Sequence, residues 1–141
     1  MARHLHALIR LNQWEVDEKR RALGVLVRRL DELEGQAGQL EKQLILEQEA
    51  ARSQPNEAGF LYGNFAQAVI RARERLAGLI NGANAEVDAA REALSEARRE
   101  LKKYEVAQAQ RDRRAAEEEA KAERFDLDEI GIQGHQRRKT G

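Results

Sequence analysis

The chain has 141 residues, of which 35% are charged and only 4% aromatic, and its 25 Lys and Arg residues balance 25 Asp and Glu residues. So polar a chain has little material for a compact core, and its many Ala, Glu, Lys, Leu and Arg residues are typical of long helices and coiled coils. The charge balance disfavours a nucleic-acid-binding protein, because binding to phosphates requires an excess of positive charge.

The sequence also lacks the signals of a secreted or membrane protein. No apolar run approaches the ~18 residues that a membrane span requires. Arginines and histidines interrupt the N-terminal stretch MARHLHALIR, where a signal peptide would be continuously apolar. The chain has no cysteine, which excludes disulfides and thiolate sites. We therefore expect a cytoplasmic protein with no direct insertion into a membrane.

The first expected element is a helix over residues 3–53 that carries a heptad repeat. Apolar residues recur at intervals of seven, and a second apolar series lies three or four positions away from the first. The first series is Ile9, Val16, Leu23, Leu30, Ala37, Leu44 and Ala51, and the second is Leu5, Leu26, Leu33 and Leu40. This alternation predicts a helix that buries one narrow stripe against a partner helix.

A turn is expected over residues 54–59. Pro55, the only proline, removes a backbone donor and ends the first helix, and Asn56 can cap the next one. Three of the six aromatic residues follow at once. They are Phe60, Tyr62 and Phe65. These aromatic side chains either plug the end of a hairpin or present an apolar patch to a partner. Phe65 continues the apolar stripe, whereas Phe60 precedes it and is the better candidate for exposure.

A second helix is expected over residues 60–125, with a stripe of the same kind. Its members are Tyr62, Phe65, Val69, Ala72, Leu76, Ile80, Ala83, Val87, Ala90, Leu94, Ala97, Leu101 and Tyr104. The spacing alternates between three and four residues except from Ala72 through Leu76 to Ile80, where two four-residue steps unwind a left-handed supercoil locally. The stripe fades beyond Tyr104, and we expect residues 126–141 to form a flexible basic tail.

Two helical arms joined by a short turn pack antiparallel. The predicted fold is therefore all-α, a two-helix antiparallel coiled-coil hairpin over residues 1–125 in the form of a rod, with arms on the order of 75 Å long. The predicted register places Leu40 beside Ala72. It also brings Gly35 and Gly38 near the level of Gly78, with Gly82 one turn away. Because each glycine costs roughly 1 kcal/mol of helix stability relative to alanine, this level of the hairpin is expected to open more readily than its neighbours.

Side chains suited to catalysis or to cofactor binding are scarce. The chain has two serines, one threonine and no cysteine, and it has no glycine-rich phosphate loop after a strand. We expect no enzymatic activity, no cofactor and no metal. His4 and His6 could ligate a metal, but two histidines at a helix terminus are more often solvated. The acidic clusters have basic neighbours and are expected to form a salt-bridged helix face.

Five short motifs occur in order around the central proline. They are Glu15-Val16-Asp17, Leu23-Gly24, Tyr62-x-x-Phe65-x-Gln67, LKKYE at 101–105 and LDEIG at 127–131. Each motif is weak alone because coiled coils resemble one another, but the ordered set covers nearly the whole chain. With this set, the chain resembles the FliJ family, the general component of the bacterial flagellar type III export apparatus.

The resemblance implies an antiparallel coiled coil similar to the stalk of the rotary ATP synthase, with no hydrolytic activity of its own. The end that bears both termini would insert into the pore of the hexameric export ATPase FliI. The stalk would also engage the export gate protein FlhA and empty export chaperones. It would act in the cytoplasm, peripheral to the inner membrane, where it promotes assembly of the ATPase ring and use of the proton motive force.

Two sets of binding residues go with this resemblance. The family's gate-binding positions correspond here to Gln36, Leu40, Phe65, Val69, Ala72 and Leu76. The family has tyrosines where Gln43 and Glu47 stand, and a histidine at the position of Leu76. The opposite end of the hairpin is basic, and an ATPase pore lined with acidic side chains would attract it. The basic residues of that end are Arg3, Arg10, Arg137, Arg138 and Lys139.

Two other functions fit the same architecture. The chain could be the equivalent stalk of a virulence-type secretion system, or a structural adaptor that only spaces two partners. The adaptor predicts no effect on any ATPase, whereas the stalk predicts stimulated hexamer formation and hydrolysis. The oligomeric state stays open, because two chains could also exchange arms or pair end to end.

Overall fold

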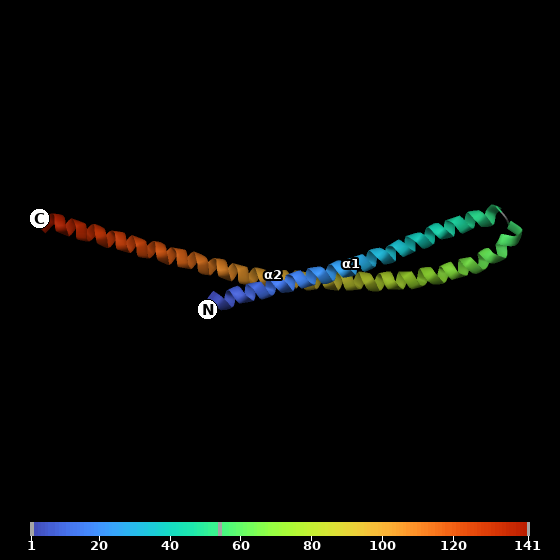
Figure 1. The fold of residues 1–141 in the computed structure, drawn as a ribbon, viewed down its shortest axis with the longest axis horizontal. Coiled ribbons are helices and arrows are strands. Elements are labelled where there is room, and N and C mark those ends of the chain that lie inside the picture. The colour runs from blue at the N-terminus through green and yellow to red at the C-terminus, as the bar shows by residue number, and fades with distance from the viewer. Residues whose placement is uncertain (1, 54, 141) are drawn as a thin grey trace. The chain divides into compact units, whose positions relative to one another are not determined.

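The protein consists of two α-helices packed against each other (Figure 1). In the computed structural model α1 spans Ala2–Ser53 and α2 spans Pro55–Thr140. Residues 1, 54 and 141 lie outside the described chain, and side chains are described for residues 4–53 and 62–138. No strand occurs within the two described ranges. The predicted all-α helical hairpin is confirmed.

The helices are divided between two compact units. The central unit comprises residues 15–97, and the terminal unit comprises residues 1–14 together with 98–141. Each unit contains a segment of α1 and a segment of α2. Within each unit these two segments pack on each other through their apolar stripes.

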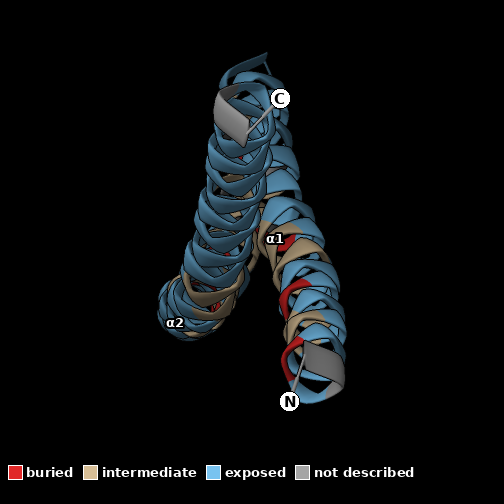
Figure 2. Ribbon diagram, turned by 90° about the vertical axis from the view of Figure 1, so that its left-hand side faces the viewer, coloured by how far each residue is buried: buried red, intermediate tan, exposed pale blue. Residues whose placement is uncertain are grey.

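The apolar stripes predicted from the heptad spacing form the contact between the helices. Every predicted stripe position from Leu5 to Ala51 on α1 and from Tyr62 to Tyr104 on α2 is buried or half-buried. Figure 2 shows the buried and half-buried residues along one side of α1. The most deeply buried members are Val69 and Val87, at 3% and 2% exposure. Among the described residues each stripe is covered by the facing helix alone, so a single line of side chains on each helix supplies the hydrophobic stabilisation of each unit.

The packing in the central unit establishes that the helices run antiparallel. Leu33, Leu76 and Ala83 form one buried cluster, and further apolar residues pack against it. These are Leu30, Ala37, Leu40 and Ile80. Glu41 of α1 pairs with Arg73 of α2, next to the predicted neighbours Leu40 and Ala72. The predicted register is therefore confirmed to within about half a helical turn.

The connection between the helices is shorter than predicted. α2 begins at Pro55, so residues 55–59 lie inside the helix rather than in a turn, and Asn56 is a helical residue rather than a cap. Proline is favoured at the first position of a helix because the N–H that it lacks would have no intrahelical acceptor there, and its fixed φ is already helical.

α2 also continues far beyond the end of the stripe. Residues 126–140, predicted as a separate tail, are part of this helix as far as Thr140. Ala120 is half-buried, whereas the other described residues from 109 to 138 are exposed. The Ala, Glu, Lys and Arg residues after Tyr104 have high helix propensity, and helical hydrogen bonds are local, so the backbone needs no neighbour to stay paired. The flexibility of residues 126–141 stays a prediction.

Neither helix, over the residues described, contains a stretch that is both long and apolar enough to cross a membrane.

Candidate functional site

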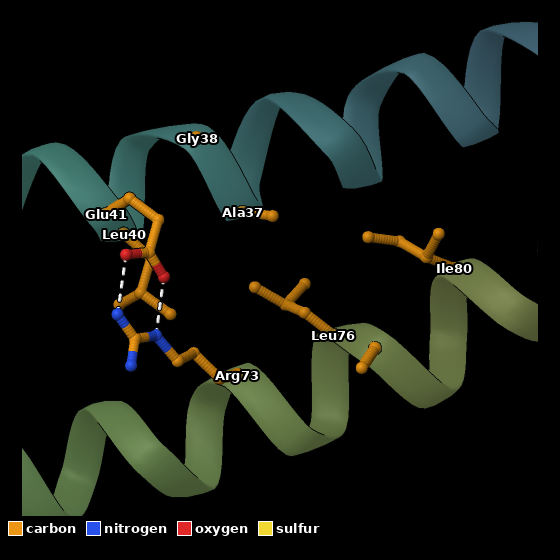
Figure 3. A pocket seen from close by; sticks show the side chains of 8 residues that line it. Ala37, Gly38, Leu40, Glu41, Arg73, Leu76 and Ile80 are labelled. Carbon is orange, nitrogen blue, oxygen red and sulfur yellow. Dashed lines mark hydrogen bonds and ion pairs between the residues drawn. The ribbon is translucent and has the colours of Figure 1, made fainter.

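A groove of about 280 Å³ lies between α1 and α2 in the central unit (Figure 3). Its lining is mostly apolar and consists of Ala37, Gly38, Leu40, Glu41, Arg73, Leu76, Ala77 and Ile80. Leu76 and Ile80 project from α2 toward α1. The groove coincides with the two four-residue steps of the α2 stripe, where a supercoil is locally unwound. Small side chains at residues 37, 38 and 77 do not fill the resulting space.

One ion pair bounds the groove. Arg73 Nε donates a hydrogen bond to Glu41 Oε1, and Arg73 Nη2 donates one to Glu41 Oε2; the donor–acceptor distance is 2.5 Å in both. The hydrogen bond from Arg73 holds the pKa of the Glu41 carboxyl below its ordinary value, and the same bond raises the pKa of Arg73. Both side chains are about half exposed. An exposed pair of this kind adds little stability. Its bidentate geometry, however, favours one register of the two helices over registers shifted by a residue or more.

The predicted gate-binding residues fall into two groups. Leu40 and Leu76 meet at the groove, and Gln36 is exposed on α1. Val69 is buried at 3% exposure and Leu76 at 7%, so their side chains are largely occupied by the contact between the helices.

Of the remaining positions, Phe65 and Ala72 belong to the stripe of α2, whereas Gln43 and Glu47 lie outside the stripe of α1. Phe65 and Ala72 are half-buried, and Gln43 and Glu47 are exposed. A partner that binds here would reach Gln36, Leu40 and the exposed rim of the groove directly. The buried members of the set would act by holding the two helices in place.

The aromatic residues after the proline are consistent with both of the original interpretations. Tyr62 is half-buried and lines a hollow with Gln48, Ala51 and Arg52 of α1, as expected of a side chain that closes the end of the hairpin. Phe65 is half-buried in the stripe. The side chain of Phe60 lies outside the described residues, so its predicted exposure stays a prediction.

Of the five basic residues predicted to bind an ATPase, three have described side chains, and these three are not all in one place. Arg10 is exposed on α1 beside the packed part of the terminal unit, and Arg137 and Arg138 are exposed near the end of α2. Arg138 lies about 50 Å along the helix beyond Tyr104, the last residue of the stripe. The side chains of Arg3 and Lys139 lie outside the described residues. The three described basic residues therefore lie in two places in the terminal unit.

No metal centre is apparent in the part of the chain whose side chains are described. His4 and His6 are exposed, and these residues include no group of three or more histidine or carboxylate side chains that could hold an ion.

Two features were not anticipated from the sequence. One is the groove rim formed by Gly38, Glu41, Arg73 and Ala77, whose sequence signal is the presence of small residues beside the stripe on both helices at one level. The other is a set of exposed apolar side chains beyond the stripe. These are Phe125, Leu127, Ile130 and Ile132.

A family model described as "Flagellar FliJ protein" matches residues 1–140 of the chain. Neither the curated proteins nor the solved structures that were searched gave a match. The matched region includes both helices and all five motifs that indicated the resemblance.

Proposed function

The chain belongs to the FliJ family of non-enzymatic flagellar export components, and from this premise we propose that it is the coiled-coil stalk that connects the export ATPase with the export gate. The observation that carries the proposal is that the family match and the helical hairpin extend over the same residues. The protein would work in the cytoplasm at the inner membrane, where it would also engage empty export chaperones. The flagellar family favours this role over that of a virulence-type stalk.

The groove of the central unit is the surface that we assign to the gate protein. Its lining is mostly apolar, and it includes two of the predicted gate-binding residues, Leu40 and Leu76. An apolar side chain of the gate could pack beside them, as anchors of protein interfaces commonly do. The pair of Glu41 and Arg73 would contribute polar contacts at the edge.

Filling the groove tests this assignment. Ala77 is exposed and lines the groove, so Ala77→Leu should occupy the space without disturbing the buried stripe. We expect it to weaken binding of the purified gate domain at least about tenfold, the equivalent of about 1.4 kcal/mol. Ala89→Leu is the matched control, because Ala89 is exposed on the same helix away from the groove. Equal affinity of both variants and the unmodified chain would remove the groove from the interface.

The terminal unit is the part that we assign to the ATPase. Replacing Arg3, Arg10, Arg137, Arg138 and Lys139 with alanine should weaken ATPase binding, most strongly at low salt, because attraction between exposed charges is screened by ions. A matched control removes five exposed cations from the central unit, namely Arg20, Arg28, Arg29, Arg71 and Arg75. Unchanged affinity of the first variant at low salt would defeat the assignment.

An ATPase assay distinguishes the stalk from an adaptor that only spaces two partners. A purified FliI-type ATPase should form hexamers at lower concentration, and hydrolyse ATP faster, when the chain is added. The adaptor function predicts the same hydrolysis rate with and without the chain.

A further inference from the structure

The C-terminal part of α2 carries large apolar side chains that are mostly exposed to solvent. Phe125, Leu127, Ile130 and Ile132 are between 59% and 68% exposed. Single exposed apolar residues are normal on a protein surface, but four within eight residues of an otherwise polar helix are not needed to keep that helix soluble or helical. Such a concentration marks a surface that another molecule covers.

These side chains lie on two sides of the helix. Leu127, Ile130 and Gly134 follow one another at spacings of three and four residues, so they share one face. We call this set the tail face. Phe125 and Ile132 are seven residues apart and lie on the opposite side. A methyl group built on Gly134 would meet nothing within 4 Å, so a second helix can approach the backbone closely at that residue.

Charges of opposite sign lie at the two ends of the tail face. Asp126 precedes Ile130 by four residues, and Arg137 and Arg138 follow Gly134 by three and four residues, so these charged side chains lie on the side of the helix that carries the tail face. Asp128 and Glu129 lie on the other side, and residues 130–134 are uncharged. A second copy placed antiparallel and centred near Ile132 brings Asp126 of each copy to the level of Arg138 of the other. A parallel copy would oppose like charges, which is unfavourable.

We propose that the tail face pairs with the tail face of a second copy of this chain, antiparallel, with Ile130 of each copy over Gly134 of the other. Such a contact is isologous and closes as a dimer, because the same surface serves both partners. The contact strip runs from residue 126 to residue 138, so it is about 20 Å long and one helix wide. It is therefore smaller than the roughly 1,200 Å² of a standard interface, and the dimer should dissociate in the micromolar range or above.

The pairing would cover part of the basic region assigned to the ATPase, so the dimer and the ATPase complex would exclude each other. This consequence rests on the proposed function. The pairing itself does not, because it requires only this chain, and it can be measured in the absence of any export protein.

Sedimentation equilibrium of the full chain from about 1 μM to 1 mM tests the pairing. We expect the average mass to rise from monomer toward dimer with concentration. Ile130→Glu should raise the dissociation constant more than tenfold. Ile132→Glu is the matched control, since it makes the same change at a similarly exposed site off the tail face, and it should have a much smaller effect. A monomer throughout the range, or equal effects of the two substitutions, would overturn the proposal.

The orientation has a separate test, because the chain has no cysteine of its own. When Ile130→Cys and Gly134→Cys chains are mixed and oxidised, the antiparallel pairing predicts that the mixed disulfide exceeds both symmetric ones. Asp126→Arg and Arg138→Asp should each weaken the dimer, and the two together should restore it. A preference for symmetric disulfides, or a double variant weaker than either single one, would refute the antiparallel pairing.

Discussion

Replacing four helical glycines of the central unit with alanine should stabilise the protein. The four are Gly35, Gly38, Gly78 and Gly82. None of the described glycines has a positive φ, and a Cβ added at any of these four sites meets no atom within 4 Å. Neither backbone conformation nor packing therefore requires glycine at these sites.

The expected gain follows from helix propensity. Alanine is favoured over glycine by about 0.5–1 kcal/mol at an interior helical position, chiefly because glycine has more conformational freedom to lose on folding. Four independent sites then give about 2–4 kcal/mol, and a chain of this size should melt about 10 °C higher. Urea and thermal unfolding followed by far-ultraviolet circular dichroism would measure both quantities. Amide exchange should slow at residues 34–38 and 77–82, which we expect to open faster than residues 23–30 in the unmodified chain.

A matched change outside the stripe serves as the control. Gly131 is exposed on the part of α2 that lies beyond the stripe, so Gly131→Ala should leave the main unfolding transition unchanged. If the fourfold variant melted at the same temperature as the unmodified chain, or at a lower one, the four glycines would have to make close contacts that are absent from the described structure. The reasoning from propensity would then be wrong.

Three further changes give independent tests. Leu33 is buried in the central cluster, whereas Leu46 is 66% exposed. Leu33→Ala should therefore lower the free energy of unfolding by about 2–4 kcal/mol, and Leu46→Ala should lower it by less than about 0.5 kcal/mol. Similar losses for the two variants in urea titrations would contradict the assignment of the stripe. The pKa of Glu41 is lowered from 4.5 by its hydrogen bond to Arg73. The contribution of this pair to the stability of the folded protein is therefore fully present above pH 4.5, and it is lost as the pH falls through the lowered pKa. The melting temperature of Glu41→Gln should therefore fall less than that of the unmodified chain when the pH drops below about 4.5, and parallel curves would show that the pair contributes nothing. Trp14 is 56% exposed, so acrylamide should quench its fluorescence nearly as well in the folded as in the unfolded chain, and strong shielding would place Trp14 in an interface.

The paired stripes could be predicted residue by residue, because burial in a two-helix structure depends on little more than heptad position. Ala37, Ala72 and Ala97 were predicted to face the other helix although alanine is common on exposed surfaces, and all three are half-buried. The irregular step through Leu76 was also predictable, since it depends on spacing alone. The register followed from the single break at Pro55.

The groove and the ion pair could not be predicted in the same way. With 25 basic and 25 acidic residues in the chain, many pairings across the helices are possible, and a shift of half a turn in register replaces one partner by another. Glu41 and Arg73 are selected only by the three-dimensional register. The start of α2 was misplaced because Asn56 was assigned as a cap, whereas proline itself is a favourable first residue. The end of α2 could not be read from the stripe either, because the residues beyond Tyr104 have helix propensity but no apolar pattern that marks where the helix ends.

The single line of packing in the central unit has a consequence for how such proteins can vary. Leu33 packs in one cluster with Leu76 and Ala83, on the facing helix at nearly the same level. Deleting seven residues from α1 together with the seven opposite them on α2 would rejoin a stripe with the same order of neighbours. Chains of this kind can therefore differ in length by whole matched repeats and still keep the same order of interior contacts.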